Sequence, residues 1–271
     1  GTGKTTCVQT FAQETDYRIA FTSPTNKATK VLRQMAANLE REIDCCTIYS
    51  LLGLLLSGDG EIRKVKAEGE NRANDYDVVV VDEGSMVGED LLNHICEAVR
   101  EFHIKIIFMG DPAQLPPINE THSQVFELSN KVSLTEVMRH DNQILALATN
   151  IRQCIYEGGD PLFSNSNDER GGVYIANNGK FRDQMEKGYT SETYKTTRDC
   201  LKTIAWRNVT VNAHNDFIRA AIYGPKVGPE FQDQERIVAC GPVIDLLAKL
   251  QGDTELLLHT DEEATVISKE I

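Results

Sequence analysis

The sequence lacks the features that mark several large classes of protein. No apolar run approaches the roughly 18–20 residues that a membrane helix needs, so we expect no membrane association. The histidines form no H-E-x-x-H pattern, and the seven cysteines include no C-x-x-C pair. Metalloprotease and common zinc-site patterns are therefore missing. We interpret the cysteines as incidental thiols in a reducing cytoplasm.

Positive charge is also scarce. The 271 residues include 28 Lys and Arg against 41 Asp and Glu, which gives a net charge of −13 and a pI near 5.0. This balance argues against a protein that coats nucleic acid with a basic surface, but a narrow local channel stays compatible with it. The 41% hydrophobic and 25% charged residues are typical of a globular chain of one or two domains.

The sequence does not begin with methionine, and its first six residues already belong to a motif whose start is missing. We therefore expect a fragment that is cut at both ends.

Strands and helices alternate along the first half of the chain. β-branched apolar runs are typical of strands buried on both faces, and apolar residues at helical spacing indicate the helices between them. Such alternation predicts a parallel sheet in an α/β domain. The expected strands are Arg18–Thr22, Asp77–Val81, Lys105–Met109 and Lys131–Leu134, and the expected helices are Lys27–Leu39 and Leu91–Phe102.

A second α/β unit is expected to begin near residues 136–141. After Gly224 the helical pattern stops and short apolar runs follow, which predicts a small β insertion. The elements expected in this half are a helix over Asn142–Tyr156, a polar loop over Gly158–Gly172, a strand over Leu201–Trp206, a helix over Val209–Tyr223, and short strands over Arg236–Cys240 and Ala264–Ser268.

The first chemical motif is Gly1-Thr2-Gly3-Lys4-Thr5-Thr6, the back end of G-x-x-x-x-G-K-[ST]. In such a loop, backbone N–H groups wrap phosphates at a helix N-terminus. Lys4 would reach the β- and γ-phosphates of ATP, and Thr5 would ligate Mg²⁺. Alone, this short motif could equally be a glycine-rich turn.

Two further motifs follow predicted buried strands. Asp82 and Glu83 end the first, where Asp82 would hold Mg²⁺ and Glu83 would act as general base on the attacking water. The alternative is a plain acidic helix start. The second is Gly110-Asp111-Pro112-Ala113-Gln114-Leu115-Pro116-Pro117, in which the Gln114 amide could bond both the γ-phosphate and that water.

In this order the three elements resemble motifs I, II and III of superfamily 1 helicases, in particular the RecD/Dda-type branch. Residues 22–28 resemble its motif Ia and residues 47–53 its next motif, although Tyr49 stands where His is usual. Residues 134–139 resemble motif IV, and residues 205–208 with Asn215 and Arg219 resemble the start of the second motor domain. Gly84 replaces the usual Ala, and the adenine-contacting glutamine and motifs V and VI are absent.

The resemblance implies two RecA-like domains that hydrolyse ATP with Mg²⁺ and step 5′ to 3′ along single-stranded DNA. Residues 1–138 would form the first motor domain, 139–224 the start of the second, and 225–271 the truncated start of a β-barrel insertion. Arg139 would be the arginine finger, and the DNA contacts would be Pro24, Thr25, Asn26, Thr47 and Ser50. Taken singly, each of these five residues is better explained as part of a turn or a helix cap.

The implied partners are single-stranded DNA and duplex junctions, with replication or recombination proteins as further candidates. The implied location is the cytoplasm of a bacterial or phage-infected cell. Residues 53–75 hold an Asp59-Gly60 hairpin signal and the basic residues Arg63, Lys64 and Lys66, where the family carries a duplex-splitting hairpin. A solvated surface hairpin explains that stretch equally well.

Two other functions stay open on the sequence. One is a P-loop ATPase of PhoH-like type without unwinding activity, which shares Gly3-Lys4-Thr5 and a similar Gln loop. The other is a non-catalytic nucleic-acid-binding relative of helicases. The motif residues that argue against it, because they are intact, are Lys4, Asp82, Glu83, Gln114 and Arg139.

Overall fold

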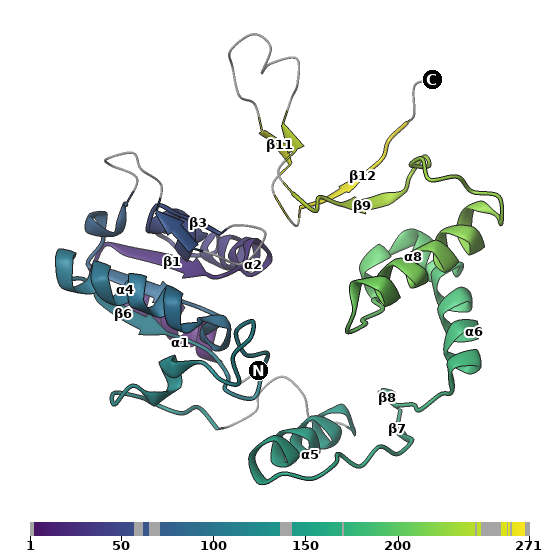
Figure 1. Ribbon diagram of the computed structural model, residues 1–271, viewed down its shortest axis with the longest axis horizontal. Helices are drawn as coiled ribbons and strands as arrows, with labels where there is room; N and C mark the ends of the chain where they lie inside the picture. The colour runs from purple at the N-terminus through teal and green to yellow at the C-terminus, as the bar shows by residue number, and fades with distance from the viewer. Residues whose placement is uncertain are drawn as a thin grey trace. The chain divides into compact units, whose positions relative to one another are not determined.

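The computed structural model describes residues 3–56, 62–64, 71–135, 143–169, 171–241, 243–244, 256–258, 260 and 262–268. The chain divides into two compact units, and each is described by itself (Figure 1). The first unit comprises Gly1–Asp141, Ala148–Asp160 and Ala239–Glu262, and the second comprises Asn142–Leu147, Pro161–Val238 and Glu263–Ile271.

The first unit is built on a four-stranded sheet (Figure 1). Its strand order is β2-β1-β5-β6. Its strands are β1 (Ile19–Ser23), β2 (Asp44–Thr47), β5 (Val78–Val81) and β6 (Lys105–Phe108). All three neighbouring pairs are parallel, so the four carboxyl ends lie at one edge. The expected α/β fold with a parallel sheet is confirmed.

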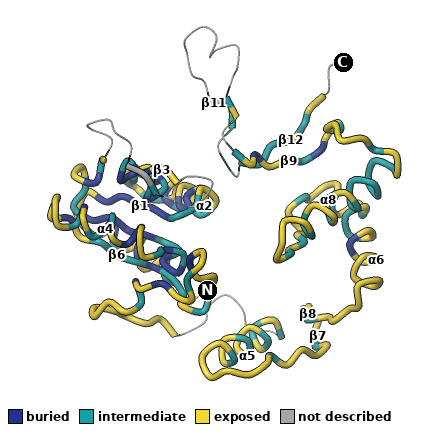
Figure 2. The backbone as a smooth tube through the Cα atoms, in the orientation of Figure 1, coloured by how far each residue is buried: buried dark blue, intermediate teal, exposed yellow. Residues whose placement is uncertain are grey.

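Helices cover both faces of this sheet, and the alternation of side chains along β1 and β5 explains why. Phe21 and Val80 point to the face covered by α1 (Lys4–Glu14) and α2 (Asn26–Ala36). Ala20 and Val79 point to the other face, against α4 (Glu89–Phe102). Every residue of β1 and β5 is buried, as a central strand covered on two faces requires (Figure 2). A buried valine or leucine contributes about 1.5–3 kcal/mol relative to an exposed one, so these two strands anchor the unit.

A short hairpin extends from the first unit. After the one-turn helix α3 (Ile48–Leu51), β3 (Leu54–Leu56) pairs antiparallel with β4 (Ile62–Lys64), inside the stretch predicted to hold a hairpin. The turn that joins them, with its Asp59-Gly60 pair, and Lys66 lie outside the described residues, and so do the side chains of Arg63 and Lys64.

The second unit is helical with small antiparallel strand pairs. Its side chains are mostly exposed (Figure 2), and Met185 is a buried apolar residue on α6. Arg219 on α8 binds Glu235 with a 2.5 Å Nε–Oε1 contact; Glu235 is buried and Arg219 is half-buried. Its elements are β7 (Ser166–Asp168), β8 (Gly171–Val173), α6 (Asn178–Tyr189), α7 (Glu192–Thr196), α8 (Asn208–Tyr223), β9 (Arg236–Val238) and β12 (Glu263–Thr265). Helix α5 (Gln143–Glu157) has residues in both units, and β10 (Val243–Ile244) and β11 (Leu256–Leu258) pair within the first.

Three expectations from the sequence are wrong in detail. Lys131–Leu134 and Leu201–Trp206 were expected as strands, but both are irregular, and Val132 and Ile204 are 91% and 90% exposed. A strand needs a hydrogen-bonded neighbour, which β propensity cannot supply. Gly158–Gly172, expected as a loop, contains β7 and the beginning of β8.

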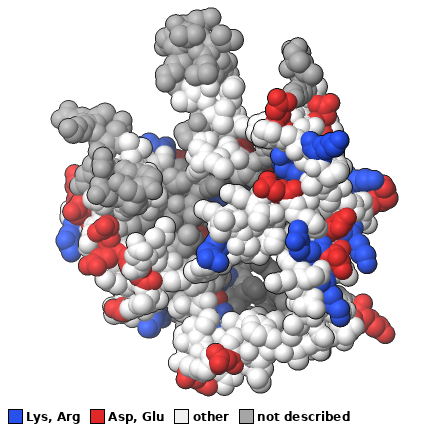
Figure 3. All heavy atoms as spheres, turned by 45° about the vertical axis from the view of Figure 1, so that its right-hand side comes forward, with Lys and Arg blue, Asp and Glu red and all other residues white. Residues whose placement is uncertain are grey.

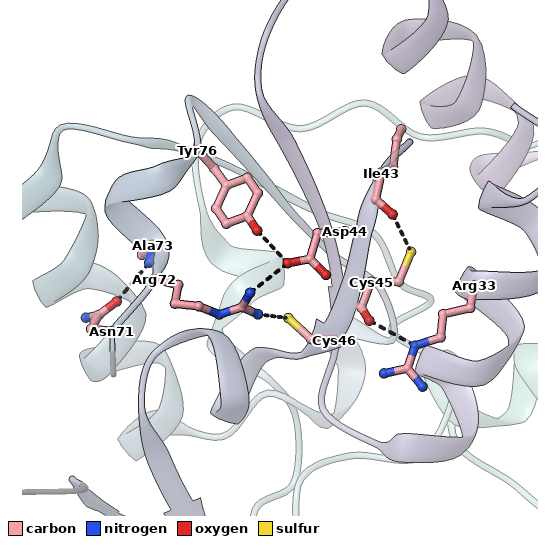
Figure 4. Close-up of polar contacts among 9 residues, drawn as sticks. All are labelled: Arg33, Ile43, Asp44, Cys45, Cys46, Asn71, Arg72, Ala73 and Tyr76. Carbon is pink, nitrogen blue, oxygen red and sulfur yellow. Dashed lines mark hydrogen bonds and ion pairs between the residues drawn. The ribbon is translucent and has the colours of Figure 1, made fainter. Parts of the chain in front are cut away.

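A polar cluster lies at the amino end of β2, away from the carboxyl edge of the sheet (Figure 4). Tyr76 donates its phenolic O–H to Asp44 Oδ2 at 2.5 Å, and Arg72 Nη1 donates to the same oxygen at 3.0 Å. Burial raises the pKa of Asp44, but these two donors outweigh it, so the pKa lies below the ordinary value. Beside the cluster is a cavity of about 820 Å³, lined in part by Arg33 and Cys45. Burial raises the pKa of the Cys45 thiol to about 11.

Candidate nucleotide site

Helix α1 begins with the residues that would hold phosphate. Gly3 adopts the left-handed conformation (φ 79°), a geometry that glycine reaches without strain, and its carbonyl accepts from the Cys7 N–H at 3.0 Å. Lys4 and Thr5 are half-buried in the first turn, and Thr6 is exposed. The unpaired N–H groups of a helix N-terminus favour an anion there. Gly1 and Thr2 lie outside the described residues.

Asp82 and Glu83 follow directly on the buried strand β5, at the carboxyl edge of the sheet. Burial raises the pKa of Asp82, while the Glu83 N–H, at 2.9 Å from Oδ1, and the Lys4 ammonium lower it in part. Burial also raises the pKa of Glu83, and the Asp82 carboxylate adds to that rise while Lys4 opposes it. The lysine and the two acids, which are 78 or more residues apart in sequence, therefore meet at one place.

The backbone at Glu83 is unusual. Glu83 has φ 55° and ψ 42°, a left-handed conformation that non-glycine residues seldom adopt. The next residue, Gly84, is buried, and its N–H donates to the carbonyl of Met109 at 2.7 Å. The hydroxyl of Ser85 is buried without a hydrogen-bond partner within the described part of the chain. This strained turn sets the direction of the Glu83 side chain, and no local sequence signal predicted it.

The loop after β6 completes the edge. A Cβ on Gly110 would lie 3.0 Å from Phe126 Cζ and 3.1 Å from the backbone nitrogens of Gly84 and Ser85, so any side chain there would crowd both loops. The Asp111 carbonyl accepts from the Gln114 N–H at 3.0 Å, and the Gln114 side chain is exposed. The motif loops after β5 and β6 are thus in direct contact.

The residues proposed to touch DNA follow the neighbouring strands. The Thr25 hydroxyl accepts from the Ala28 N–H at 3.3 Å and caps α2, and the Thr47 hydroxyl accepts from the Ser50 N–H at 3.1 Å and caps α3. Each therefore has the helix-cap role that explains it without DNA. A cap uses an oxygen lone pair, so the hydroxyl hydrogen stays able to donate to a phosphate. Pro24 is half-buried, and Asn26 and Ser50 are exposed at the same edge.

Comparison with known proteins agrees with this geometry. The AAA domain family matches residues 1–157, more than half of the chain. The chain belongs to this family. An uncharacterized protein of Acanthamoeba polyphaga mimivirus is 27% identical over 252 residues, covering 82% of this chain and 51% of its own length. The RecD subunit of the RecBCD enzyme of Mycolicibacterium smegmatis is 32% identical over 140 residues, covering 44% of this chain and 24% of its own length.

The chain also shares its fold with a solved structure. Pif1 helicases, in a structure described as two coordinating copies that unwind forked double-stranded DNA, match 100% of this chain and 66% of theirs, with 16% identity and a TM-score of 0.54. The resemblance to superfamily 1 helicases is confirmed, as a helicase-type P-loop NTPase of the RecD/Pif1 type. The AAA chain spans about half the length, or less, of the curated relatives it matches.

Arg139 lies outside the described residues, so its place relative to the site stays a prediction. In the part of the chain that the structure describes, no helix is both long and apolar enough to span a bilayer. Sequence reasoning missed one ion pair at this edge, between Asp111 and Arg152 of α5, because the partners are 41 residues apart and neither has a local signal.

The oxygen atoms at this edge can be compared with the ligands that Mg²⁺ needs, which do not have to form a complete protein site. No group of three or more His, Cys, Asp or Glu side chains that could hold a metal occurs among the described residues. Mg²⁺ commonly binds through one or two protein oxygens together with substrate phosphates and water. The Thr5 hydroxyl and the Asp82 carboxylate, beside the helix start that would hold phosphate, fit that requirement.

Proposed function

We propose that the whole protein is an ATP-dependent DNA helicase motor, which hydrolyses ATP to translocate 5′ to 3′ on single-stranded DNA and unwind duplex. One observation carries the proposal: Lys4, Asp82, Glu83 and the Gln114 loop meet at the carboxyl edge of one parallel sheet. Ligands bind outside the carboxyl ends of the strands in open α/β sheets.

In this proposal each side chain has a distinct task. Gly3 and the first turn of α1, with Gly1, Thr2 and Thr6, surround the phosphates, and Lys4 neutralises the β- and γ-phosphate charge. Thr5 and Asp82 would hold Mg²⁺, which supplies charge neutralisation between the phosphate oxygens. Glu83 accepts a proton from the attacking water, and its raised pKa makes it a better acceptor. Gln114 orients that water, and Arg139 stabilises the transition state.

DNA binding in this proposal is local rather than spread over a basic surface. On the face drawn in Figure 3, Lys and Arg side chains are intermixed with Asp and Glu, as the net charge of −13 leads one to expect. The five residues proposed to bind DNA lie at or just after the carboxyl ends of β1 and β2 and would contact phosphates through hydroxyl groups, the Asn26 amide and exposed backbone. They are Pro24, Thr25, Asn26, Thr47 and Ser50. The Pif1 structure with forked DNA supports this class of partner.

The proposed domain boundaries follow the motifs. Residues 1–138 would be the first motor domain, with the 53–75 hairpin as an insertion, and residues 139–224 would begin the second. Residues 225–271 would begin a β insertion.

The deciding experiment is an ATPase assay of the complete protein with and without single-stranded DNA, at several salt concentrations. We expect stimulation by DNA and a steep loss of DNA affinity with salt, because the contacts are mainly to phosphate. Lys4→Ala is the matched control, because it removes the cation facing the phosphates and should abolish turnover.

Three other results of this assay would change the proposed function. An ATPase that ignores DNA would favour the PhoH-like alternative. DNA binding without ATPase activity would favour a non-catalytic relative. Turnover of Lys4→Ala within a few-fold of the unmodified protein would overturn the nucleotide site itself.

A further inference from the structure

The loop that carries Gln114 is held by an arginine from a distant helix. Arg152 of α5 donates from Nη1 to Asp111 Oδ1 at 2.9 Å and from Nη2 to Asp111 Oδ2, so the two side chains form a bidentate ion pair. The Asp111 side chain is only 15% exposed. Such planar Arg–carboxylate pairs fix geometry as well as adding attraction.

Asp111 in turn shapes the loop from within. Its Oδ1 also accepts from the Ala113 N–H at 3.1 Å, and its carbonyl accepts from the Gln114 N–H at 3.0 Å. One residue therefore closes the turn over 111–114 through both its side chain and its backbone. If the carboxylate rotated, the turn that presents Gln114 would keep its backbone bond but lose the side-chain bond to the Ala113 N–H.

Charge explains why this carboxylate needs an arginine. Asp111 lies close enough to Glu83 to raise its pKa, and close enough to Lys4 to feel its positive charge. Asp82, Glu83 and Asp111 thus bring three acids to one phosphate-binding edge. Burial raises the pKa of Asp111, but Arg152 and the Ala113 N–H outweigh it and hold the pKa below its ordinary value. Asp111 therefore stays ionised and paired.

We propose that Arg152 is a positioning residue for ATP hydrolysis, which acts by clamping Asp111 so that Gln114 meets the terminal phosphate and the attacking water. The inference rests on the proposed function, since it assigns a residue to that same site. Arg152 touches no reacting atom in this scheme. Its contribution appears only in the step that needs Gln114 in place.

A positioning role predicts a particular pattern of kinetics. Arg152→Ala should lower kcat by about 10- to 100-fold, the scale on which misplacing a reacting group acts. The KM for ATP should change by less than a few-fold, because Arg152 donates to Asp111 of the Gln114 loop, which acts in the hydrolysis step of this scheme. Arg152→Lys should recover only part of the loss, because an ammonium lacks the planar fork.

A remote ion pair of the same type provides the control. Arg18 binds Asp77 with Nη2–Oδ1 at 2.9 Å and Nε–Oδ2 at 3.3 Å, at the amino end of the same sheet. Arg18→Ala removes a comparable pair, but it leaves the nucleotide edge untouched. It should therefore keep kcat within about two-fold.

The experiment measures steady-state ATPase over a range of ATP concentrations, with saturating single-stranded DNA, on the complete protein. The variants are Arg152→Ala, Arg152→Lys, Asp111→Asn, the double variant with both Arg152→Ala and Asp111→Asn, and Arg18→Ala. The losses of kcat caused by Arg152→Ala and by Asp111→Asn should not add in the double variant, because each change removes the same contact. Melting temperatures report whether each variant is folded.

The outcomes separate the inference from the function beneath it. A folded Arg152→Ala protein with the kcat of Arg18→Ala, or losses that add in the double variant, would overturn the positioning role alone. If Arg152→Ala does not fold, the Arg152→Lys variant decides, and an unchanged kcat there would equally overturn it. An unmodified protein without ATPase activity would overturn both the proposed function and this inference.

Discussion

The Gly84 N–H donates to the carbonyl oxygen of Met109 at 2.7 Å, which ties the turn after β5 to the end of β6. The general-base candidate Glu83 comes directly before this bond, and the loop that carries Gln114 comes directly after it. This bond therefore links the two loops directly.

Gly110→Ala should loosen the junction. The added methyl group would press on Phe126 and on the backbone nitrogens of Gly84 and Ser85, and such crowding typically costs about 1–3 kcal/mol of unfolding free energy. Gly179→Ala on α6 is the control, because its added methyl group would meet only Asn177 Oδ1 at an ordinary 3.6 Å. That change should stabilise by about 0.4–1 kcal/mol. Urea unfolding of both variants measures the difference, and a shift of the same sign in both would contradict the crowding.

Glu83→Gln and Asp82→Asn should fail in different ways. Glu83→Gln removes the proton acceptor, so it should leave ATP binding intact and slow hydrolysis by about 10²–10⁴. Asp82→Asn should instead weaken Mg²⁺-dependent nucleotide binding, because it removes the carboxylate that would hold the ion. Nucleotide titration alongside single-turnover hydrolysis separates the two. Loss of binding in both variants would refute this division of tasks.

Arg139→Ala should depress kcat by about 10³–10⁵, the usual scale for an arginine finger, with a much smaller effect on nucleotide binding. Arg139→Lys should rescue poorly, because a point charge cannot replace the planar guanidinium. Steady-state ATPase with saturating single-stranded DNA, together with binding titration, tests this. A near-normal kcat would show that Arg139 is structural.

Asp44 should make the stability of the chain depend on acid pH. Its pKa is lowered in the folded state, so its contribution is present above the ordinary value of about 3.9 and is lost as pH falls through the folded value. Asp44→Ala should cost about 1 kcal/mol at pH 7, a figure kept small because the side chain is 38% exposed. The difference should shrink below pH 4. Urea unfolding at pH 7 and pH 3, with exposed Asp16→Ala as control, measures it, and a gap that does not change with pH would disprove it.

The sequence predicted the central part of the fold because its signals there are strong. A run of four valines over Val78–Val81 can hardly be anything but a buried strand, and a parallel sheet places the residues that follow its strands at one edge. The order of the motifs then predicted one shared site for Lys4, Asp82, Glu83 and Gln114. The structure places the first three close in space and the Gln114 loop against them.

Other features depend on contacts that no local pattern encodes. Strand β2 is only Asp44–Thr47 and has no run of β-branched residues, so its pairing with β1 defines it rather than propensity. The Asp111–Arg152 pair joins positions 41 residues apart. The left-handed backbone of Glu83 follows from how the two loops meet.

That backbone has a consequence for how this protein can be improved. Holding a non-glycine residue in a left-handed conformation costs about 1–3 kcal/mol, which a glycine or asparagine at position 83 would largely recover. A search for heat-resistant variants would therefore favour changes at Glu83 that discard the carboxylate. Selection for thermal stability and selection for turnover would therefore favour different residues at position 83. A screen for heat-resistant variants of this chain should measure ATPase activity from the first round.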